Sequence, residues 1–176
     1  MSAPAQVGAL VRLPDPARPT LSATELRAAF GAFPTGVVLV GAVVDGAPVG
    51  LLASSFTSVS LDPPLVSVAV ARTSSTWPLL ADSPRLGIGV LASDSEHLVR
   101  LLSRPAADRF AGVPWCAGPH GELTIRGAAA TFAVRRHDQV RGGDHDVAFL
   151  EVLELDHDRL RQPLVFHRSG LRRLAG

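Results

Sequence analysis

Residues 37–53 read VVLVGAVVDGAPVGLLA, two apolar runs separated by the dipeptide Asp45-Gly46. Apolar runs of this length that are joined by Asp-Gly are typical of a β-hairpin. We therefore expect one strand from Val37 to Val44 and a second from Ala47 to Ala53. This hairpin indicates a chain built from antiparallel strands, and the rest of the sequence is interpreted outward from it.

The remaining segments add more short strands and a few short helices. Further strands are expected at 65–71, 86–91, 123–134, 147–155 and 164–166, and helices near 22–34, 75–82 and 94–102, with an irregular stretch from about 104 to 121. The Ser22-x-x-Glu25 spacing is that of a capping box, and Ser93 or Asp94 is expected to cap the third helix. This order does not fit regular βαβ alternation. A mainly β fold, a closed or split antiparallel barrel with helices packed on it, fits better.

Length and composition predict one domain with little net charge. With 176 residues, 47% of them hydrophobic, the chain can build a substantial core. Residues 1–20, with four prolines, are expected to form a flexible N-terminal arm, and residues 21–176 to form the domain. The 17 basic residues, all arginine, nearly balance 16 acidic residues, which favours neither nucleic acid nor anionic lipid as a partner. No signal peptide or membrane-spanning run is present, so we expect a cytoplasmic protein.

Several motif-like features do not predict the chemistry that they resemble. Gly87, Gly89 and Ala92 have the spacing of a dinucleotide-binding loop, but they fall inside an expected strand. We therefore attribute the glycines to close packing against a neighbouring backbone. The six histidines have no metal-ligand spacing, so no metal is expected. The single cysteine, Cys116, cannot form an internal disulfide and is interpreted as a small core residue.

Three polar segments are the candidate binding residues. The segment from Arg72 to Thr76 lies between a strand and a helix and combines a cation with hydroxyls, which suits a phosphate; simple helix capping is the alternative. The segment from Ala53 to Ser58 could hydrogen-bond a flat heteroaromatic ring, or could be a polar strand end. The turn from Gly142 to His145 allows close approach of a ligand, although such a turn is commonly only a turn.

Taken in order, these segments resemble the short flavin reductases, which are the reductase components of two-component flavin monooxygenases. The stretches that carry the resemblance are residues 33–37, 50–66, 74–76, 108–113 and 143–145. The resemblance covers about residues 24–174. It implies a mainly β, Greek-key split barrel of the FMN-binding type that forms a homodimer and binds FMN or FAD near the dimer interface. It also implies NADH or NADPH as the hydride donor, and a flavin-dependent monooxygenase as the partner that receives reduced flavin.

The resemblance also implies roles for individual residues. Thr35, Gly36 and Val37 would lie beside the isoalloxazine ring; Leu52, Ala53, Ser54 and Ser55 would line its polar edge; Arg72, Ser74, Ser75 and Thr76 would hold the phosphate end; Arg109 and Phe110 would help to close the site; Gly143, Asp144 and His145 would lie near the nicotinamide. His145 is expected to position the nicotinamide by hydrogen bonding. The family usually has Thr at the position of Leu52, so one hydroxyl contact to flavin is lost here.

Two other functions remain open at this point. A protein that binds flavin as a carrier, without turnover, is compatible with Leu52. An FMN oxidase of the pyridoxamine-phosphate type would share the split barrel, but the absence of lysine and the presence of Gly143-Asp144-His145 argue against it. The sequence leaves open the choices between FMN and FAD and between NADH and NADPH.

Overall fold

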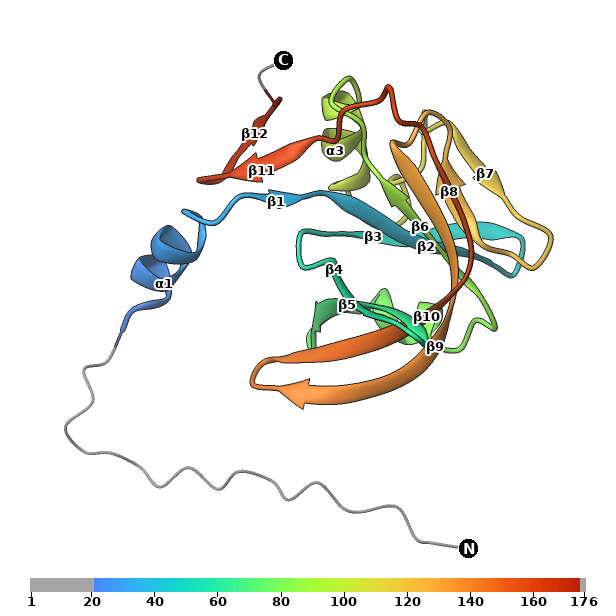
Figure 1. The fold of residues 1–176 in the computed structure, drawn as a ribbon, viewed down its shortest axis with the longest axis horizontal. Coiled ribbons are helices and arrows are strands. Elements are labelled where there is room, and N and C mark those ends of the chain that lie inside the picture. Colours follow the sequence, from blue (N-terminus) through green and yellow to red (C-terminus); the bar gives the residue numbers. More distant parts are fainter. Residues whose placement is uncertain (1–20, 175–176) are drawn as a thin grey trace, which may run out of the picture.

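A computed structural model describes residues 21–174, in which short helices accompany a large antiparallel sheet (Figure 1). The helices are α1 (Ala23–Phe30), α2 (Trp77–Ala81) and α3 (Glu96–Leu102). The strands are β1 (Thr35–Gly36), β2 (Val38–Val44), β3 (Ala47–Ala53), β4 (Thr57–Leu61), β5 (Pro64–Ala71), β6 (Leu86–Val90), β7 (Trp115–Ala117), β8 (Leu123–Ile125), β9 (Ala130–Gly142), β10 (His145–His157), β11 (Val165–His167) and β12 (Gly170–Arg172). The arm expected at residues 1–20 lies outside the described residues.

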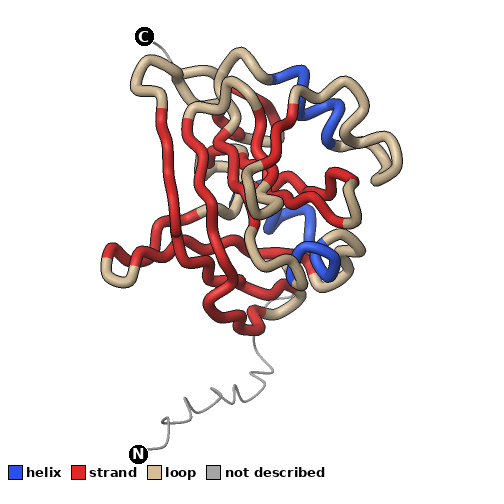
Figure 2. The backbone as a smooth tube through the Cα atoms, turned by 90° about the vertical axis from the view of Figure 1, so that its right-hand side faces the viewer, coloured by secondary structure: helices blue, strands red, loops and turns tan. Residues whose placement is uncertain are grey.

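Seven strands form the large sheet, in the order β3-β2-β6-β9-β10-β5-β4, and every neighbouring pair is antiparallel. Two small sheets, β1-β11-β12 and β7-β8, accompany it. The long strands curl around the interior (Figure 2). Within residues 21–174 the edge strands β3 and β4 do not pair with each other, so the sheet curls without closing. The expected mainly β architecture with few helices is confirmed; the split barrel and the homodimer stay predictions.

The hairpin that opened the sequence analysis is confirmed as β2 and β3. Val44 pairs with Ala47 across a two-residue turn. Both turn residues, Asp45 and Gly46, have positive φ, at 50° and 77°. A type I′ turn requires this conformation at both central positions, and the Asp-Gly dipeptide is suited to it.

The structure differs from the sequence expectation at several elements. Four short strands, β1, β4, β7 and β12, were not predicted. The single strand expected at 123–134 is interrupted by a turn at Gly127, whose φ is +77°, and divides into β8 and β9. β9 continues to Gly142 because it forms a long hairpin with β10, and its exposed polar residues gave no alternating pattern. Neither Ser93 nor Asp94 caps α3: Ser95 is the N-cap residue, and Asp94 pairs instead with Arg161.

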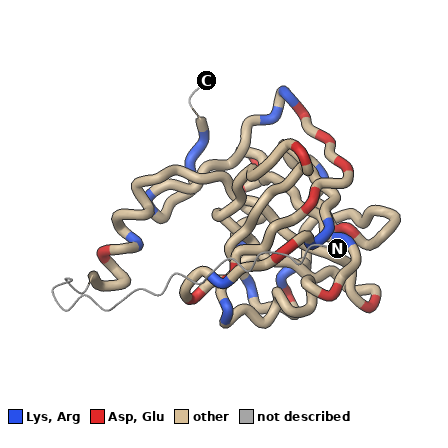
Figure 3. Tube along the Cα trace, turned by 60° about the horizontal axis from the view of Figure 1, so that its bottom comes forward, with Lys and Arg blue, Asp and Glu red and all other residues tan. Residues whose placement is uncertain are grey.

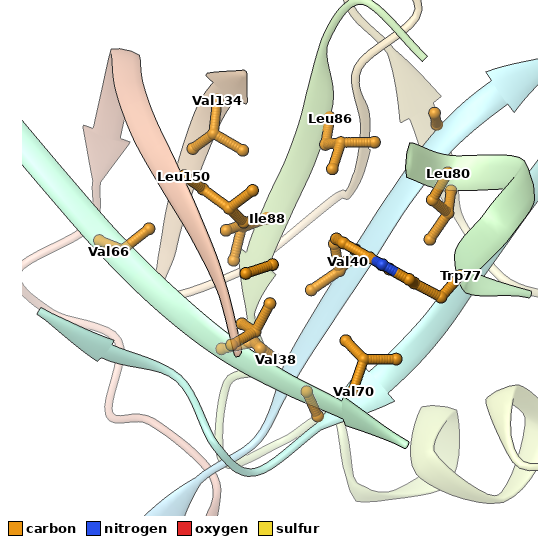
Figure 4. Close-up of a cluster of buried hydrophobic side chains, with 14 residues drawn as sticks. Val38, Val40, Val66, Val70, Trp77, Leu80, Leu86, Ile88, Val134 and Leu150 are labelled. Carbon is orange, nitrogen blue, oxygen red and sulfur yellow. The ribbon is translucent and has the colours of Figure 1, made fainter. Parts of the chain in front are cut away.

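One cluster of buried side chains fills the inside of the curled sheet. Trp77 and Leu80 of α2 face Val40 of β2 in this cluster (Figure 4). The other members come from strands across the whole width of the large sheet: Val38, Ala42, Ala53, Val66, Val68, Val70, Leu86, Ile88, Val134, Ala148 and Leu150. Helix α2 therefore covers the interior of the sheet and is fixed in place by its two large apolar side chains.

A second cluster lies on the other face of β2. Val37 and Leu39 point to this side and pack with Leu98 and Leu102 of α3. The remaining members are Leu91, Val113, Leu123, Ile125 and Leu164. Because β2 is buried on both faces, its sequence is a continuous apolar run rather than an alternating one. Within residues 21–174, no helix is long and apolar enough to cross a membrane.

Strand β8 crosses over the large sheet in direct contact with Gly87 of β6. A Cβ atom added at Gly87 would collide with the carbonyl oxygen of Leu123 and would lie 2.6 Å from its carbonyl carbon. A Cβ atom added at Gly89 would meet nothing closer than the Ile125 nitrogen, at 3.6 Å. The expected role of these glycines in close backbone packing is therefore confirmed for Gly87.

We expect Gly87→Ala to reduce the free energy of unfolding by about 3 kcal/mol, because the backbone of β8 would have to move. Gly89→Ala is the matched control, with an expected effect within about 1 kcal/mol. Urea denaturation of both variants measures the difference. Equal effects of the two substitutions would contradict the close crossing.

A buried carboxylate ties the β7–β8 turn to the residue that precedes β6. Glu122 is 4% exposed; it accepts hydrogen bonds from the His120 N–H, at 2.9 Å, and from the Arg85 guanidinium, at 3.3 Å. Burial raises the pKa of Glu122, but hydrogen bonds from its own N–H, from His120 and from Arg85 outweigh burial. The pKa of Glu122 in the folded protein therefore lies below its ordinary value of 4.5.

Ionised Glu122 stabilises the fold above its unfolded-state pKa, and this contribution is lost as pH falls through the lower folded-state pKa. We expect Glu122→Gln to cost about 1–2 kcal/mol at neutral pH. The difference between the two proteins should shrink as pH is lowered below 4.5, where the carboxylate of the parent protein becomes protonated. Urea midpoints measured in pH steps test this, and a difference that is constant at all pH values would show that the charge contributes nothing.

Candidate functional site

Three adjoining hollows follow the ends of β3 and β5 and continue to α1 on one side and α2 on the other. The central hollow, of 360 Å³, is lined by Leu51, Leu52, Ala53, Ser54, Ser55, Ala69, Val70, Ala71, Ser74 and His145. The second, of 390 Å³, is lined by Leu51, Leu52, Thr73, Ser74, Ser75, Thr76, Leu102, Ser103 and Arg109. The third, of 520 Å³, is lined by Arg27, Phe30, Gly31, Phe33, Thr35, Ser54, Ser55, Phe166 and Ser169. The central hollow shares wall residues with each of the other two, and the three hollows together are called the groove here.

Ser55 fixes the floor of the central hollow. Its hydroxyl donates to the Ala69 carbonyl oxygen, at 3.0 Å, and accepts from the Ala69 N–H, at 2.9 Å. Strand β5 extends past the last residue paired with β4, so these two backbone groups have no neighbouring strand. The Ser55 side chain takes the place of that strand. Ser54, beside it, is exposed to the groove.

The hydroxyl-rich segment before α2 faces Arg109 across the second hollow. The Arg109 guanidinium donates to the Gly50 carbonyl oxygen and, at 3.2 Å, to the Thr76 hydroxyl. Ser74 accepts from the Trp77 N–H at 3.2 Å, so part of the segment does cap the helix. Arg72, which was expected here, is exposed and is not among the residues that line the groove. The cation that lines this hollow is Arg109.

Phe110 anchors the loop that carries Arg109. A Cβ atom added at Gly50 would lie 2.9 Å from the Phe110 ring, so this ring packs directly over the glycine in β3. Phe110 also contacts the second core cluster. It lines none of the three hollows; its effect on the groove is to position Arg109.

The Gly-Asp-His segment forms the tight turn between β9 and β10. Gly143 has a φ of +72° at the first central position, which suits glycine in a hairpin turn. The Asp144 carbonyl oxygen accepts from the Arg72 N–H at 3.0 Å, which holds the turn against β5. His145 Nδ1 lies 2.8 Å from Asp144 Oδ1, and this hydrogen bond lowers the pKa of Asp144. Of the three residues, His145 lines the central hollow.

The segment Thr35-Gly36-Val37 is divided between the groove and the core. Strand β1 pairs with β11, which places Thr35 opposite Phe166 at the edge of the third hollow. Thr35 Oγ1 is buried and has no hydrogen-bond partner among the described residues. Gly36 is exposed, and Val37 belongs to the second core cluster. Of the three, the structure thus brings Thr35 to the groove.

Sequence reasoning missed the part of the groove that α1 forms. Arg27, Phe30 and Phe33 line the third hollow. They are 71% and 74% exposed. No residue of α1 is buried, and the helix lies apart from the large sheet (Figure 1). An apolar stripe in the sequence indicates an amphipathic helix, but it does not show which part of the protein covers the apolar face of that helix.

The walls of the three hollows carry basic side chains but, among the described residues, no acidic ones. Basic and acidic residues are interspersed along the trace (Figure 3). Among the described residues, no carboxylate lines any of the three hollows, whereas Arg27 and Arg109 lie at opposite ends. A separate hollow of 190 Å³ carries Glu122, Glu154 and Asp156 and is unsuited to an anion. The hydroxyls, the two cations and the orphaned Thr35 Oγ1 fit a phosphate-bearing heteroaromatic ligand. Residues 21–174 contain no group of three or more metal-ligating side chains.

Two known proteins with similar sequences are both named as reductases or reductase subunits. The chain is 42% identical over 121 residues to the stachydrine N-demethylase reductase subunit of Rhizobium meliloti (strain 1021), covering 68% of this chain and 53% of that protein. It is 35% identical over 156 residues to an NADH-dependent FAD reductase of Streptomyces globisporus, covering 86% and 85%. The chain thus spans about half the length of the first of these relatives and most of the second.

Solved structures lead to the same family. The NADH:FAD oxidoreductase of Streptomyces globisporus C-1027, in complex with NAD and FAD fragments, matches with a TM-score of 0.82 at 34% identity, covering 94% of this chain and 98% of that one. The model of the flavin reductase like domain matches residues 30–175. The resemblance inferred from the motifs is confirmed, and the chain belongs to the flavin reductase family.

Proposed function

We propose that this protein is a flavin reductase that transfers hydride from NADH or NADPH to FMN or FAD. The observation that carries the proposal is the groove, whose walls, within the part of the chain that the structure describes, offer hydroxyls and two arginines but no carboxylate. The names of two relatives, an FMN reductase (NADH) and an NADH-dependent FAD reductase, support it. When bound, nicotinamide and flavin supply both reacting groups, so the protein has to position them rather than provide an acid or a base.

The groove divides this task among its parts. Arg109, Ser75 and Thr76 hold the flavin phosphate, since they are the cation and hydroxyls of one hollow. Leu52, Ala53 and Ser54 line the central hollow where the flavin ring lies. Leu52 offers apolar contact there, and Ser54 retains a hydroxyl that the ring can use. Gly143 lines none of the three hollows; its part is to form the turn that carries His145.

His145 positions the nicotinamide in this proposal. It lies in the wall of the central hollow, and its Nδ1 is engaged with Asp144. When Nδ1 donates to the carboxylate, Nε2 is an acceptor, so the imidazole can accept one hydrogen bond from a ligand amide. Asp144 is exposed and acts by setting the orientation and tautomer of this ring.

The same proposal includes the assembly and the partner. Exposed apolar side chains on α1 and an unclosed sheet fit a homodimeric split barrel in which a second copy covers part of the groove. Several relatives are named as reductase components of flavin-dependent monooxygenases, so reduced flavin would pass to such an oxygenase. A single half-buried cysteine fits the reducing cytoplasm.

Turnover of the purified protein separates the reductase from a flavin carrier. We expect NADH or NADPH to be consumed under air only when FMN or FAD is added. The loss of nicotinamide absorbance measures this consumption. The flavin that gives the higher kcat/KM is the preferred one. Measurable flavin binding without consumption of either nicotinamide would support the carrier, and Leu52→Thr would then test whether the missing hydroxyl is the cause.

A second prediction concerns the phosphate. Arg109→Ala is expected to weaken flavin binding roughly tenfold to a hundredfold, because a half-buried charge-assisted contact is lost, whereas Arg72→Ala should change it less than about threefold. Quenching of flavin fluorescence measures both, and Arg109→Lys, which keeps the charge, should retain part of the affinity. If Arg72→Ala weakened flavin binding more than Arg109→Ala, the flavin phosphate would lie beside Arg72 instead of Arg109.

A further inference from the structure

Residues 72–76, which include the hydroxyls proposed to hold the flavin phosphate, are attached at both ends to the β9–β10 hairpin. At the first end, the Arg72 N–H donates to the Asp144 carbonyl oxygen at 3.0 Å. At the second end, the Trp77 indole N–H donates to Oε1 of Gln139 at 3.3 Å. The hairpin therefore determines where this segment lies.

The attachment at Trp77 is, among residues 21–174, the one side-chain hydrogen bond that joins α2 to the hairpin. Trp77 is 7% exposed, and a buried indole N–H that loses its acceptor costs free energy. The acceptor on β9 thus restrains the orientation of the indole. Thr76, the preceding residue, accepts from Arg109 at 3.2 Å. A shift of Trp77 would therefore move a hydroxyl of the second hollow.

Gln139 is itself held by a second hydrogen bond. Its Nε2 donates to Asp146 Oδ2 at 3.1 Å. Gln139 lies opposite Ala148 in the β9–β10 ladder, so Asp146 is its diagonal neighbour, within reach of a long side chain. An amide carries an acceptor and a donor, and both are used here: the oxygen meets the indole and the nitrogen meets the carboxylate. The three side chains form one chain of hydrogen bonds from α2 to β10.

This chain of hydrogen bonds ends one residue from His145. Successive side chains of a strand point to opposite faces. Asp146 points toward Gln139, whereas His145 lines the central hollow. Holding Asp146 in place thus also holds the part of β10 from which His145 projects. The hydroxyls of the second hollow and the imidazole of the central hollow are fixed to the same hairpin.

We propose that Gln139 is a positioning residue, which acts through Trp77 and Asp146 to hold the hydroxyls of residues 74–76 where they bind the flavin phosphate. Gln139 lines none of the three hollows. The assignment rests on the proposed flavin reductase function. Gln139 acts on the phosphate of the ligand more than on its ring, because the wall of the central hollow comes mainly from β3, β5 and the residues that follow β3.

Binding of FMN and of riboflavin tests the proposal without turnover, since the two ligands differ only by the phosphate. Gln139→Glu nearly keeps the shape of the side chain and still accepts from the indole, but it sets a carboxylate against that of Asp146. We expect this variant to bind FMN roughly tenfold more weakly and riboflavin less than about threefold more weakly. Quenching of flavin fluorescence measures both. In turnover, the KM for FMN should rise with little change in kcat.

A second substitution restores the chain of hydrogen bonds with one of its bonds reversed. In the double variant Gln139→Glu with Asp146→Asn, the new carboxylate accepts from the indole and from the new amide, and the net charge equals that of the parent protein. We expect the double variant to bind FMN within about threefold of the parent protein. Asp146→Asn alone keeps an oxygen that accepts from Gln139, so its loss should also stay within about threefold.

Two uncharged variants separate the hydrogen bonds from the added charge. Gln139→Leu removes both hydrogen bonds and should reproduce the selective loss of FMN affinity. His137→Leu is the matched control on β9: His137 is exposed, takes part in no side-chain hydrogen bond among residues 21–174, and should be replaceable without effect on either flavin. Urea midpoints show whether each variant folds. If Gln139→Leu does not fold, Gln139→Glu and the double variant decide the question.

Other results overturn the proposal. If Gln139→Glu weakens FMN and riboflavin equally, Gln139 supports the groove as a whole and not the phosphate segment. If the double variant binds FMN as weakly as Gln139→Glu, the chain of hydrogen bonds does not position the segment. If Arg109→Ala abolishes the preference for FMN but Gln139→Glu leaves it intact, this inference alone fails. A parent protein that binds FMN no more tightly than riboflavin contradicts the phosphate site itself, and with it this inference.

Discussion

The architecture depends on the burial of β2 on both of its faces. Val38 and Val40 face the interior of the curled sheet, while Val37 and Leu39 face the cluster beneath α3. A strand in this position needs cover on two sides, which the curled sheet with α2 supplies on one side and α3 with β8 on the other. The hairpin partner β3 is then left at the edge of the sheet, and its outer end becomes a wall of the groove.

Where β8 crosses the sheet, the backbones approach so closely that side chains have to be absent. Gly87 and Gly41 are paired across β6 and β2, and both lie under Leu123, which is fully buried. Gly87 and Gly89 have the spacing of a dinucleotide-binding loop, yet Gly87 serves close backbone packing. The ligand groove is built elsewhere, from strand ends, a turn and the segment before α2.

Features of the fold that depend on interactions between residues close in sequence were predictable from the sequence. Asp45-Gly46 specified its turn because both residues had to adopt positive φ, and Ser22 with Glu25 formed the capping box that their spacing predicted. Contacts distant in sequence were not predictable. Nothing local distinguishes Arg109 from Arg72 as the cation of the second hollow, since Arg109 reaches Thr76 only through the packing of Phe110 on Gly50. The role of α1 was hidden for the same reason, because an apolar stripe does not reveal its neighbour.

The hydrogen bonds of Ser55 have a consequence for how the sheet edge behaves in a crowded cell. A bare stretch of β5 beside an open groove would present unpaired N–H and C=O groups, a template on which a strand of another chain could assemble. Ser55 occupies both groups of Ala69 with a single hydroxyl. The protein can thus keep a groove open to small molecules while the edge that borders it is closed to aggregation.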